Sequence, residues 1–472
     1  MTDRFLLNQQ LIETTCPRHE LVLDFIRHNR GLTGTKEACR EGDCGACQIL
    51  LGQLLDNRLY YQAVNACLLP AGAVSCRHVV TIEGLNGTEL NPIQQALLDN
   101  GAIQCGYCSP GLVIALTGFF LNSADSDERA AVDSVAGNLC RCTGYAGIKR
   151  AIRQLCLDYD LSRSPHKNRI ADLMAWGILP AYFSGIAQSL ASCSPNETSA
   201  LQHNAVLIAG GTDLFVHKPE KLQIRPLHFL TPRPSFPTIR KERQDFVIDA
   251  LTTVEQLRTS PQLQQSFPEI AEDFKQICSA PVRQRATVGG NLVNASPIGD
   301  LAVFLLALDA RLTLVSERQT RTVELKNFFN AYKQVDLHAD EQLLEIRFEI
   351  PEHDHAFSYE KISKRTYLDI ASVNSALCIR HAGGRIEKAH LSAGGVAPYP
   401  LYLATTSEHF LGQAITSELV KAAADTAQGE ISPVSDIRGS ATYKRLLLRQ
   451  LIYAHFLKLF PDAISWEALH GH

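Results

Sequence analysis

Four cysteines near the N-terminus constrain this chain most. Three of them follow the spacing C-x4-C-x2-C, and nineteen residues separate the third from the fourth. They are Cys39, Cys44, Cys47 and Cys67. This spacing is typical of a 2Fe–2S cluster, in which one tight loop and a distant thiolate enclose two irons. Gly42 and Gly45 let the loop backbone fold closely enough. A zinc site or unligated thiols are the alternatives, and zinc more often uses two C-x2-C pairs.

A second set of cysteines has another pattern, in which thirty-one residues separate a C-x2-C pair from a C-x-C pair. Its members are Cys105, Cys108, Cys140 and Cys142. Each pair lies at a predicted helix end, so the two loops can hold another 2Fe–2S cluster, and from spacing alone a structural zinc ion is the alternative. The other six cysteines stand alone, and we expect them to be buried small apolar side chains. They are Cys16, Cys76, Cys156, Cys193, Cys278 and Cys378.

Composition places the chain among soluble proteins of several domains. Its 472 residues exceed one domain, and 45% of them are hydrophobic, which is enough for several cores. The 45 Lys and Arg against 49 Asp and Glu give no reason to expect a nucleic-acid or membrane partner. No membrane span or signal peptide is recognised, so we expect a cytoplasmic protein. In that compartment, fourteen cysteines indicate metal binding rather than a disulfide framework.

Local patterns divide the chain into a β-rich segment, a helical segment, a linker without chemistry, an α/β segment, and a last segment of antiparallel hairpins and helices. These cover residues 1–86, 87–160, 161–199, 200–350 and 351–472. In the helical segment, Pro92 suits a first helical turn, and Ser109 followed by Pro110 predicts a helix N-cap and first turn. Gly137 predicts the end of a helix over 127–136. Further helices are expected over 148–159, 416–426 and 442–459.

Two glycine-rich stretches mark the α/β segment as a candidate nucleotide-binding domain. The first, LIAGGTDL at 207–214, is a strand that enters a Gly–Gly turn, whose N–H groups suit a pyrophosphate. The second, ATVGGNLVNASPIGD at 286–300, predicts another Gly–Gly turn with polar groups on Thr287, Asn291, Ser296 and Asp300. The first stretch lacks the G-x-G-x-x-G pattern, so the Rossmann fingerprint is absent and a dinucleotide would have to be bound in another way. A plain hairpin turn is the alternative for the first stretch.

The cysteine motifs resemble those of a known family. GLTGTKEACREGDCGAC, QCGYCSPGLV and NLCRCTGYAGI, within residues 1–160, are similar to the iron–sulfur half of the molybdenum hydroxylases, the family of xanthine dehydrogenase and aldehyde oxidase. The resemblance implies a β-grasp, ferredoxin-like domain for the first cysteine set, with its cluster farther from molybdenum. It implies a four-helix domain for the second set, with the nearer cluster, and it weakens the case for zinc. Ala38 stands where the family commonly has glycine, and we expect a modest change in loop packing.

From about 200 to 460 the chain resembles the FAD-binding domain of the same family, which has a vanillyl-alcohol-oxidase type of flavin fold and a C-terminal α+β subdomain. The implied pyrophosphate contacts are Leu207, Ile208, Ala209, Gly210, Gly211, Thr212, Asp213 and Leu214. The other implied FAD contacts are Ile277, Thr287, Gly289, Gly290, Asn291, Asp300, Leu343 and Lys361. From the residues alone, Lys361 suits an exposed lysine equally well, Ile277 and Leu343 suit core positions, and Asp300 suits a helix N-cap.

The union of iron–sulfur and FAD parts in one chain resembles the small subunit of bacterial xanthine dehydrogenases. No molybdopterin domain is recognised, so the resemblance implies a separate large subunit that holds molybdopterin, in an α2β2 assembly. Electrons from xanthine or hypoxanthine would pass through the second cluster and then the first to FAD and NAD+, and no catalytic base is expected in this chain. The alternatives are another substrate (an aldehyde, nicotinate or another N-heterocycle), another acceptor such as oxygen, or a non-enzymatic redox or metal-binding protein.

Overall fold

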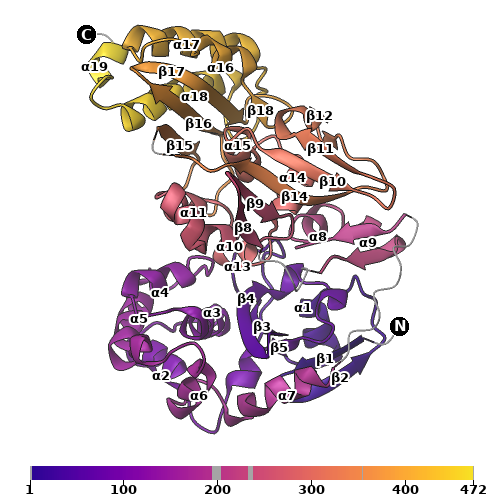
Figure 1. The fold of residues 1–472 in the computed structure, drawn as a ribbon. Coiled ribbons are helices and arrows are strands. Elements are labelled where there is room, and N and C mark those ends of the chain that lie inside the picture. The colour runs from indigo at the N-terminus through magenta and orange to yellow at the C-terminus, as the bar shows by residue number, and fades with distance from the viewer. Residues whose placement is uncertain (1–2, 194–203, 232–237, 353, 471–472) are drawn as a thin grey trace. The chain divides into compact units, whose positions relative to one another are not determined.

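The computed structural model of the chain describes residues 3–193, 204–231, 238–352 and 354–470 (Figure 1). The chain forms two compact units. The first combines Met1–Pro234 with the short segment Cys278–Ala286, and the second combines Ser235–Ile277 with Thr287–His472. No helix among the described residues is both long and apolar enough to span a membrane.

The first unit begins with a five-stranded sheet, which is the predicted β-rich domain. Its strands are β1 (Asp3–Leu7), β2 (Gln10–Thr14), β3 (Gln48–Leu55), β4 (Arg58–Asn65) and β5 (His78–Val80), in the order β2-β1-β5-β3-β4. β1 runs parallel to β5, and the other neighbours are antiparallel. A short helix, α1 (Val22–Asp24), continues into a π-helical turn, η1 (Phe25–Asn29). Its side chains Leu23, Phe25 and Ile26 join one apolar core with the sheet.

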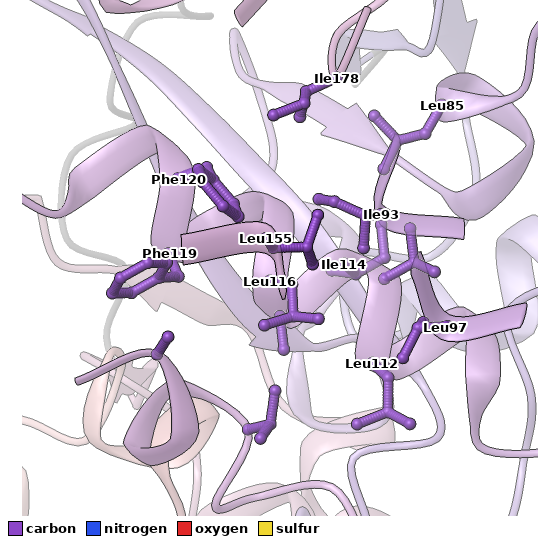
Figure 2. Packing of buried hydrophobic residues seen from close by; sticks show 14 of the residues in the cluster. Leu85, Ile93, Leu97, Leu112, Ile114, Leu116, Phe119, Phe120, Leu155 and Ile178 are labelled. Carbon is purple, nitrogen blue, oxygen red and sulfur yellow. The ribbon is translucent and has the colours of Figure 1, made fainter. Parts of the chain in front are cut away.

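Four helices follow and confirm the predicted helical domain: α2 (Pro92–Asp99), α3 (Ser109–Asn122), α4 (Glu128–Ser134) and α5 (Ala146–Asp158). Asn91 caps α2 in a reciprocal capping box with Gln94, and Pro92 occupies the first helical position. Almost all of α3 is buried, because apolar side chains surround its axis. Side chains from three helices, among them Ile93, Leu116 and Leu155, meet in one core (Figure 2).

Two predicted helix boundaries in this domain are wrong. The N-cap of α3 is Cys108 rather than Ser109, because the helix begins directly after the second cysteine of its C-x2-C pair. Helix α4 ends at Ser134, so Gly137 does not terminate it. Gly137 instead lies in close packing, since a Cβ there would stand 2.5 Å from the Pro281 ring.

The stretch expected to be a linker contains the helices α6 (Arg169–Ala175) and α7 (Ile186–Ala191) and the 3-10 turns η5 (Leu161–Arg163) and η6 (Ala181–Gly185). Its residues 194–199 lie outside the described part of the chain. The buried Arg169 guanidinium donates hydrogen bonds to the carbonyls of Phe120 (2.8 Å), Ser123 (2.6 Å) and Ser164 (2.6 Å). These bonds tie the start of the stretch to the helical domain.

Cys76 and Cys193 form a disulfide, with Cα atoms 5.5 Å apart and a separation of 117 residues in sequence. The expectation that both are isolated side chains is therefore wrong. A pairing over this distance depends on the tertiary fold, which spacing does not reveal. Of the other isolated cysteines, Cys378 is buried as expected, Cys16 and Cys156 are half-buried, and Cys278 is exposed, contrary to expectation.

The rest of the first unit is a small parallel β-structure. β6 (Val206–Ile208) pairs with β7 (Leu227–Phe229), and α8 (Leu214–His217) and α9 (Pro219–Ile224) connect them. The segment 278–286, with α13 (Ala280–Arg283), packs on the first domain. Ser279 Oγ donates to the Gly42 carbonyl (2.9 Å), and Gln62 Nε2 donates to the Gln284 carbonyl (3.3 Å).

The second unit contains two antiparallel sheets. The first, in the order β11-β10-β14-β9-β8, consists of β8 (Ile239–Glu242), β9 (Asp245–Asp249), β10 (Arg311–Val315), β11 (Thr320–Glu324) and β14 (Gln342–Glu349). The second, in the order β15-β16-β17-β18, consists of β15 (His355–Ile362), β16 (Val373–Ala382), β17 (Arg385–Gly394) and β18 (Leu401–Tyr402). The predicted late hairpins are confirmed. β12 (Phe329–Ala331) and β13 (Gln334–Val335) form a separate two-stranded hairpin.

The α-helices of this unit fall into two groups along the chain. Between β9 and β10 lie α10 (Val254–Thr259), α11 (Pro261–Ser266), α12 (Ile270–Asp273), α14 (Val288–Asn294) and α15 (Asp300–Leu306). After β18 come α16 (Ala404–His409), α17 (Ser417–Glu430), α18 (Ala441–Leu459) and α19 (Trp466–His470). The 3-10 turns η7 (Phe274–Gln276) and η8 (Leu325–Asn327) complete the set. The predicted helices near the C-terminus are confirmed, and their apolar faces share one core with β16 and β17.

Candidate iron–sulfur and flavin-binding sites

The first cysteine set lies on a loop before β3 and on the turn after β4. Three residues of the loop, Arg40, Gly42 and Gly45, have positive φ angles, and only glycine adopts such a backbone at little cost. A Cβ at Gly42 would lie 2.6 Å from Leu68, and a Cβ at Gly45 would overlap the Gly137 carbonyl oxygen. The two glycines therefore allow both the turn of the loop and its close packing.

The four thiols of this set meet in two pairs. The hydrogen bond with Cys44 lowers the pKa of the Cys39 thiol to about 4, and the hydrogen bond with Cys67 lowers the pKa of Cys47. The Glu41 backbone N–H also donates to Cys39 Sγ at 3.4 Å. The same two hydrogen bonds raise the pKa of the partner thiols, Cys44 and Cys67, so the sulfurs of each pair lie within hydrogen-bonding reach of each other.

The second cysteine set is also paired. Cys142 Sγ lies 3.6 Å from Cys105 Sγ, and Cys108 hydrogen-bonds Cys140. Among the described residues, no three His, Cys, Asp or Glu side chains converge as a single metal ion requires. Two thiols for each of two irons are what a 2Fe–2S cluster needs, whereas zinc needs four ligands around one point. The pairing of the thiols in both sets fits two thiolates at each iron of a 2Fe–2S cluster.

The two sets differ in exposure. Cys47 and Cys67 are buried, whereas Cys105 and Cys142 are exposed. Large apolar side chains near the second set are also exposed; they are Ile103, Tyr107, Leu139 and Tyr145. The second set is therefore partly exposed: Cys105 and Cys142 lie at the surface, near exposed apolar side chains in the sequence, whereas Cys108 is half-buried and Cys140 is buried.

Hydrogen bonds join the loops of the two sets directly. The Leu139 N–H, beside Cys140, donates to the Cys44 carbonyl at 2.9 Å. Asn138 Nδ2 donates to the Gly45 carbonyl at 3.3 Å, and the Tyr107 hydroxyl donates to the Glu37 carbonyl. The ligand loops are thus in contact within one compact unit.

The predicted pyrophosphate loop, 207–214, begins on β6 in the first unit. The N–H groups of its four central residues, 210–213, make no hydrogen bond with any residue that the structure describes. Gly211 has a φ of 75°, so the turn depends on glycine. Consecutive free N–H groups of this kind form a concave site for an anion. This loop fits the phosphates of a dinucleotide.

The second predicted Gly–Gly turn is wrong, because Gly289 and Gly290 lie in the first turn of α14. Their N–H groups are already used: Gly289 donates to the Ala250 carbonyl (2.8 Å) and Gly290 to Thr287 Oγ1 (3.1 Å). A Cβ at Gly289 would stand 2.8 Å from Ala250 Cβ, so this glycine serves close packing. In contrast, Asn291 Oδ1 is a buried acceptor without a partner, which leaves it available to a cofactor.

Asp300 and Lys361, far apart in the sequence, meet in the second unit. Lys361 Nζ lies 2.9 Å from Asp300 Oδ2 and also donates to the Gln276 carbonyl (2.7 Å), beside the buried Ile277. Only 1% of the Lys361 side chain is exposed, so the alternative of an exposed lysine is wrong. Asp300 is the first residue of α15 and Gly299 is the N-cap, so the N-cap alternative is wrong too.

Two residues of this network were not predicted. The Tyr359 hydroxyl and Asn374 Nδ2 both donate to Asp300 Oδ1, at 2.7 and 2.6 Å. Burial, together with the Asp300 carboxylate, raises the pKa of Tyr359 well above its ordinary value. The alternation of a strand places Tyr359 on the same face as Lys361, and this signal was available in the sequence. Leu343, another predicted contact, is a half-buried residue of β14 opposite Leu314.

Four family models match successive parts of the chain. They are described as a 2Fe-2S iron-sulfur cluster binding domain (residues 5–72), a 2Fe-2S binding domain (81–153), an FAD binding domain in molybdopterin dehydrogenase (182–352) and a CO dehydrogenase flavoprotein C-terminal domain (358–459). The predictions of two 2Fe–2S clusters and FAD as cofactors, and of the fold class, are thereby confirmed.

Known proteins resemble the chain over different extents. Xanthine dehydrogenase/oxidase of Rattus norvegicus is 26% identical over 519 residues, which cover 98% of this chain and 39% of that protein. The chain thus spans about two fifths of the length of the curated relatives it matches. A chain of a carbon monoxide dehydrogenase from Hydrogenophaga pseudoflava, in a form that lacks the Mo-pyranopterin moiety, is 30% identical with a TM-score of 0.52; the match covers 56% of this chain and 92% of that one. A quinoline 2-oxidoreductase chain from Pseudomonas putida 86, 23% identical with a TM-score of 0.50 over the same shares, has the same fold.

Proposed function

Since this chain belongs to the molybdenum hydroxylase family, whose iron–sulfur and FAD-binding domains it carries, we propose that it is the electron-transfer subunit of a xanthine dehydrogenase. Its electrons would come from xanthine or hypoxanthine and leave on NAD+. When bound, the clusters supply one-electron carriers, and FAD supplies a carrier that takes up two electrons and returns them as a hydride. The similarity to proteins named xanthine dehydrogenase supports this substrate.

The observation that carries the proposal is the two-by-two pairing of eight thiols. In the first set, Cys39 with Cys44 would bind one iron and Cys47 with Cys67 the other. In the second set, the pairs would be Cys105 with Cys142 and Cys108 with Cys140. The hydrogen bond from Leu139 to Cys44 would keep the two ligand loops at a fixed distance, as a relay requires.

We place the molybdenum-bearing partner at the second cysteine set. Exposed apolar patches mark interaction surfaces, and Cys105 and Cys142 lie beside exposed apolar side chains. The partner would bury this patch and exclude water from the nearer cluster. A molybdopterin-containing large subunit, in an α2β2 assembly, is the partner that we propose.

For FAD, we propose that the free N–H groups of 210–213 bind the pyrophosphate. Thr287, Asn291, Asp300 and Lys361 would supply polar contacts, because they include an unpartnered acceptor and a desolvated ion pair. The remaining FAD contacts are proposed on the family resemblance alone; they are Leu207, Ile208, Ala209, Leu214, Ile277, Gly289, Gly290 and Leu343.

A second candidate keeps the relay but changes the substrate. The 30% identity with the carbon monoxide dehydrogenase chain supports it, because relatives with this fold differ in what they oxidise. Carbon monoxide, an aldehyde, nicotinate or another N-heterocycle would then replace xanthine. The acceptor would be NAD+, oxygen or another oxidant.

The test is to purify the native complex through this chain and to measure xanthine-dependent NAD+ reduction, with iron, zinc, molybdenum and flavin quantified on the same sample. We expect about four irons and one flavin per chain, together with activity. A loaded complex that ignores xanthine would favour the second candidate, and a panel of the other substrates would identify it. Zinc without iron would overturn the relay.

Variants of single cysteines test the ligand assignment in the same complex. Cys142→Ser should abolish one of two distinct 2Fe–2S signals in electron paramagnetic resonance and remove about half of the iron. Cys156→Ser is the matched control, since Cys156 is a half-buried free thiol on α5 of the same domain. Equal iron loss in both variants would contradict the assignment.

A further inference from the structure

The Arg285 side chain fixes the backbone of the predicted pyrophosphate loop, 207–214, in the first unit. Arg285 Nη2 and Nε both donate to the Gly210 carbonyl, at 3.0 and 3.3 Å. The backbones are also in contact, since a Cβ at Gly210 would overlap the Arg285 carbonyl oxygen. With 9% of its surface exposed, Arg285 is fixed within the protein. Its guanidinium therefore determines where the Gly210 carbonyl points.

The direction of that carbonyl determines the direction of the next N–H group. In a trans peptide the C=O and the following N–H point to opposite sides. Because the Gly210 carbonyl points toward Arg285, the Gly211 N–H points away from it. This N–H is one of the four without a partner among the described residues. Arg285 thus orients the donor at the centre of the loop.

The charges near Arg285 also favour an anion. Burial, and then the positive charge of Arg77, lower the pKa of Arg285, and burial also lowers the pKa of Arg77. Neither arginine forms an ion pair with a carboxylate in the part of the chain that the structure describes. A bound diphosphate would relieve the cost of two desolvated cations without a counter-ion.

We propose that Arg285 is a positioning residue for the diphosphate of FAD. It holds the Gly210–Gly211 peptide in the orientation that turns N–H groups toward the diphosphate, and with Arg77 it supplies positive charge beside the loop. This inference rests on the proposed FAD site and goes beyond it, because no sequence motif assigns Arg285. The proposed role concerns the phosphates alone, so a substitution of Arg285 should not change the affinity for the flavin ring.

The test uses the full chain, freed of flavin and then titrated with three probes: FAD, ADP and riboflavin. ADP carries the diphosphate without the flavin, and riboflavin carries the flavin without phosphate. Arg285→Met should raise the Kd for FAD and for ADP by about 10- to 100-fold, because it removes a charged hydrogen-bond donor. The Kd for riboflavin and the iron content should stay unchanged, whereas the Tm should fall, because the Gly210 carbonyl loses its buried donor.

Arg225→Met is the matched control. Arg225 also donates through Nε (3.1 Å) and Nη2 (2.6 Å) to a single carbonyl, that of Asn204 just before β6, but it is exposed. We expect no change in any of the three Kd values. Arg285→Lys, which keeps the charge and one donor, should lose less affinity for FAD than Arg285→Met. If Arg285→Met fails to fold, Arg285→Lys serves as the test instead. The inference then requires that its Kd rises for FAD and stays unchanged for riboflavin.

Two results would overturn the inference: unchanged FAD and ADP binding in Arg285→Met, or an equal loss of riboflavin binding, which would indicate a general collapse of the site. Both are distinct from a failure of the proposed function. If the wild-type chain takes up no FAD, the proposed function itself fails. If it binds FAD and the variant binds FAD equally well, only the role of Arg285 fails.

Discussion

Lys361 and Lys388 both belong to the four-stranded sheet of the second unit, yet 1% of the Lys361 side chain is exposed against 47% of Lys388. Lys361 pairs with Asp300 inside the protein, whereas Lys388 pairs with Glu349 at 3.2 Å in solvent. The sequence around either lysine looks alike. The family resemblance singled out Lys361, but its burial depends on Asp300, which no local pattern relates to it. For the cysteines, the motif spacing predicts the two sets, but three of the four pairs join different loops: Cys47 with Cys67, Cys105 with Cys142 and Cys108 with Cys140.

We predict that Lys361→Met destabilises the second unit by about 3–5 kcal/mol, because it leaves the Asp300 carboxylate buried without its cation. The measurement is the free energy of unfolding from a urea titration. Lys388→Met is the control and should cost less than about 1 kcal/mol, as expected for an exposed pair. Similar losses in both variants would contradict the role of burial.

Among the elements, helices with strong local signals were predictable, and those that rest on distant contacts were not. Asn91, in a capping box, and Pro92, at the first helical position, predict the start of α2. The start of α14 gives the opposite signal, since Gly289 and Gly290 disfavour a helix. At α14, the Gly289 N–H donates to the carbonyl of Ala250, which is remote in sequence, and the backbone at Gly289 packs against Ala250 where a Cβ would not fit. Tertiary contacts thus override local propensity at this element.

We predict that Gly45→Ala disrupts the loop that joins the two cysteine sets. A left-handed φ costs a non-glycine residue about 1–2 kcal/mol, and at Gly45 the added methyl also overlaps the Gly137 carbonyl oxygen. Gly101→Ala is the control, because Gly101 has a φ of 64° with open space around it. Gly45→Ala should lose iron and stability, whereas Gly101→Ala should show only the backbone cost and keep its iron. Iron content and urea unfolding are the measurements.

At the scale of the whole molecule, the composition of the two units was the least predictable feature. Residues 278–286 belong to the first unit although the chain on both sides belongs to the second. Their contacts, such as Ser279 with Gly42 and Arg285 with Gly210, join residues that are remote in sequence. The Cys76–Cys193 disulfide was missed for the same reason. The order of domain types along the chain was predictable, because each type has its own local pattern.

Acid should weaken the first unit through His78. This side chain is fully buried between the Tyr61 hydroxyl (2.7 Å) and the Asn8 carbonyl (2.8 Å), and burial lowers its pKa from 6.5 to about 4. The unfolded chain therefore binds more protons between these values, so stability is lost as pH falls from about 6.5 toward 4. From pH 7 to 5 the loss through this group is roughly 2 kcal/mol. His78→Gln should remove this pH dependence of the free energy of unfolding. His217→Gln, at an exposed site, should leave it unchanged.

Asp273 should give the stability of the second unit the opposite dependence on pH. Burial raises the pKa of this carboxyl from 3.8 to about 7, so the folded state keeps a proton that the unfolded state loses. Stability is then present at low pH and lost as pH rises from about 4 to 7, by roughly 2 kcal/mol between pH 5 and 7.

Trp176 lies in the first unit and Trp466 in the second, so single-tryptophan versions report each unit separately. The stability difference between wild type and variant should rise with pH for His78→Gln and fall with pH for Asp273→Asn. Asp425→Asn, on the exposed face of α17, should leave the slope unchanged; the same sign in both units would contradict the two assignments.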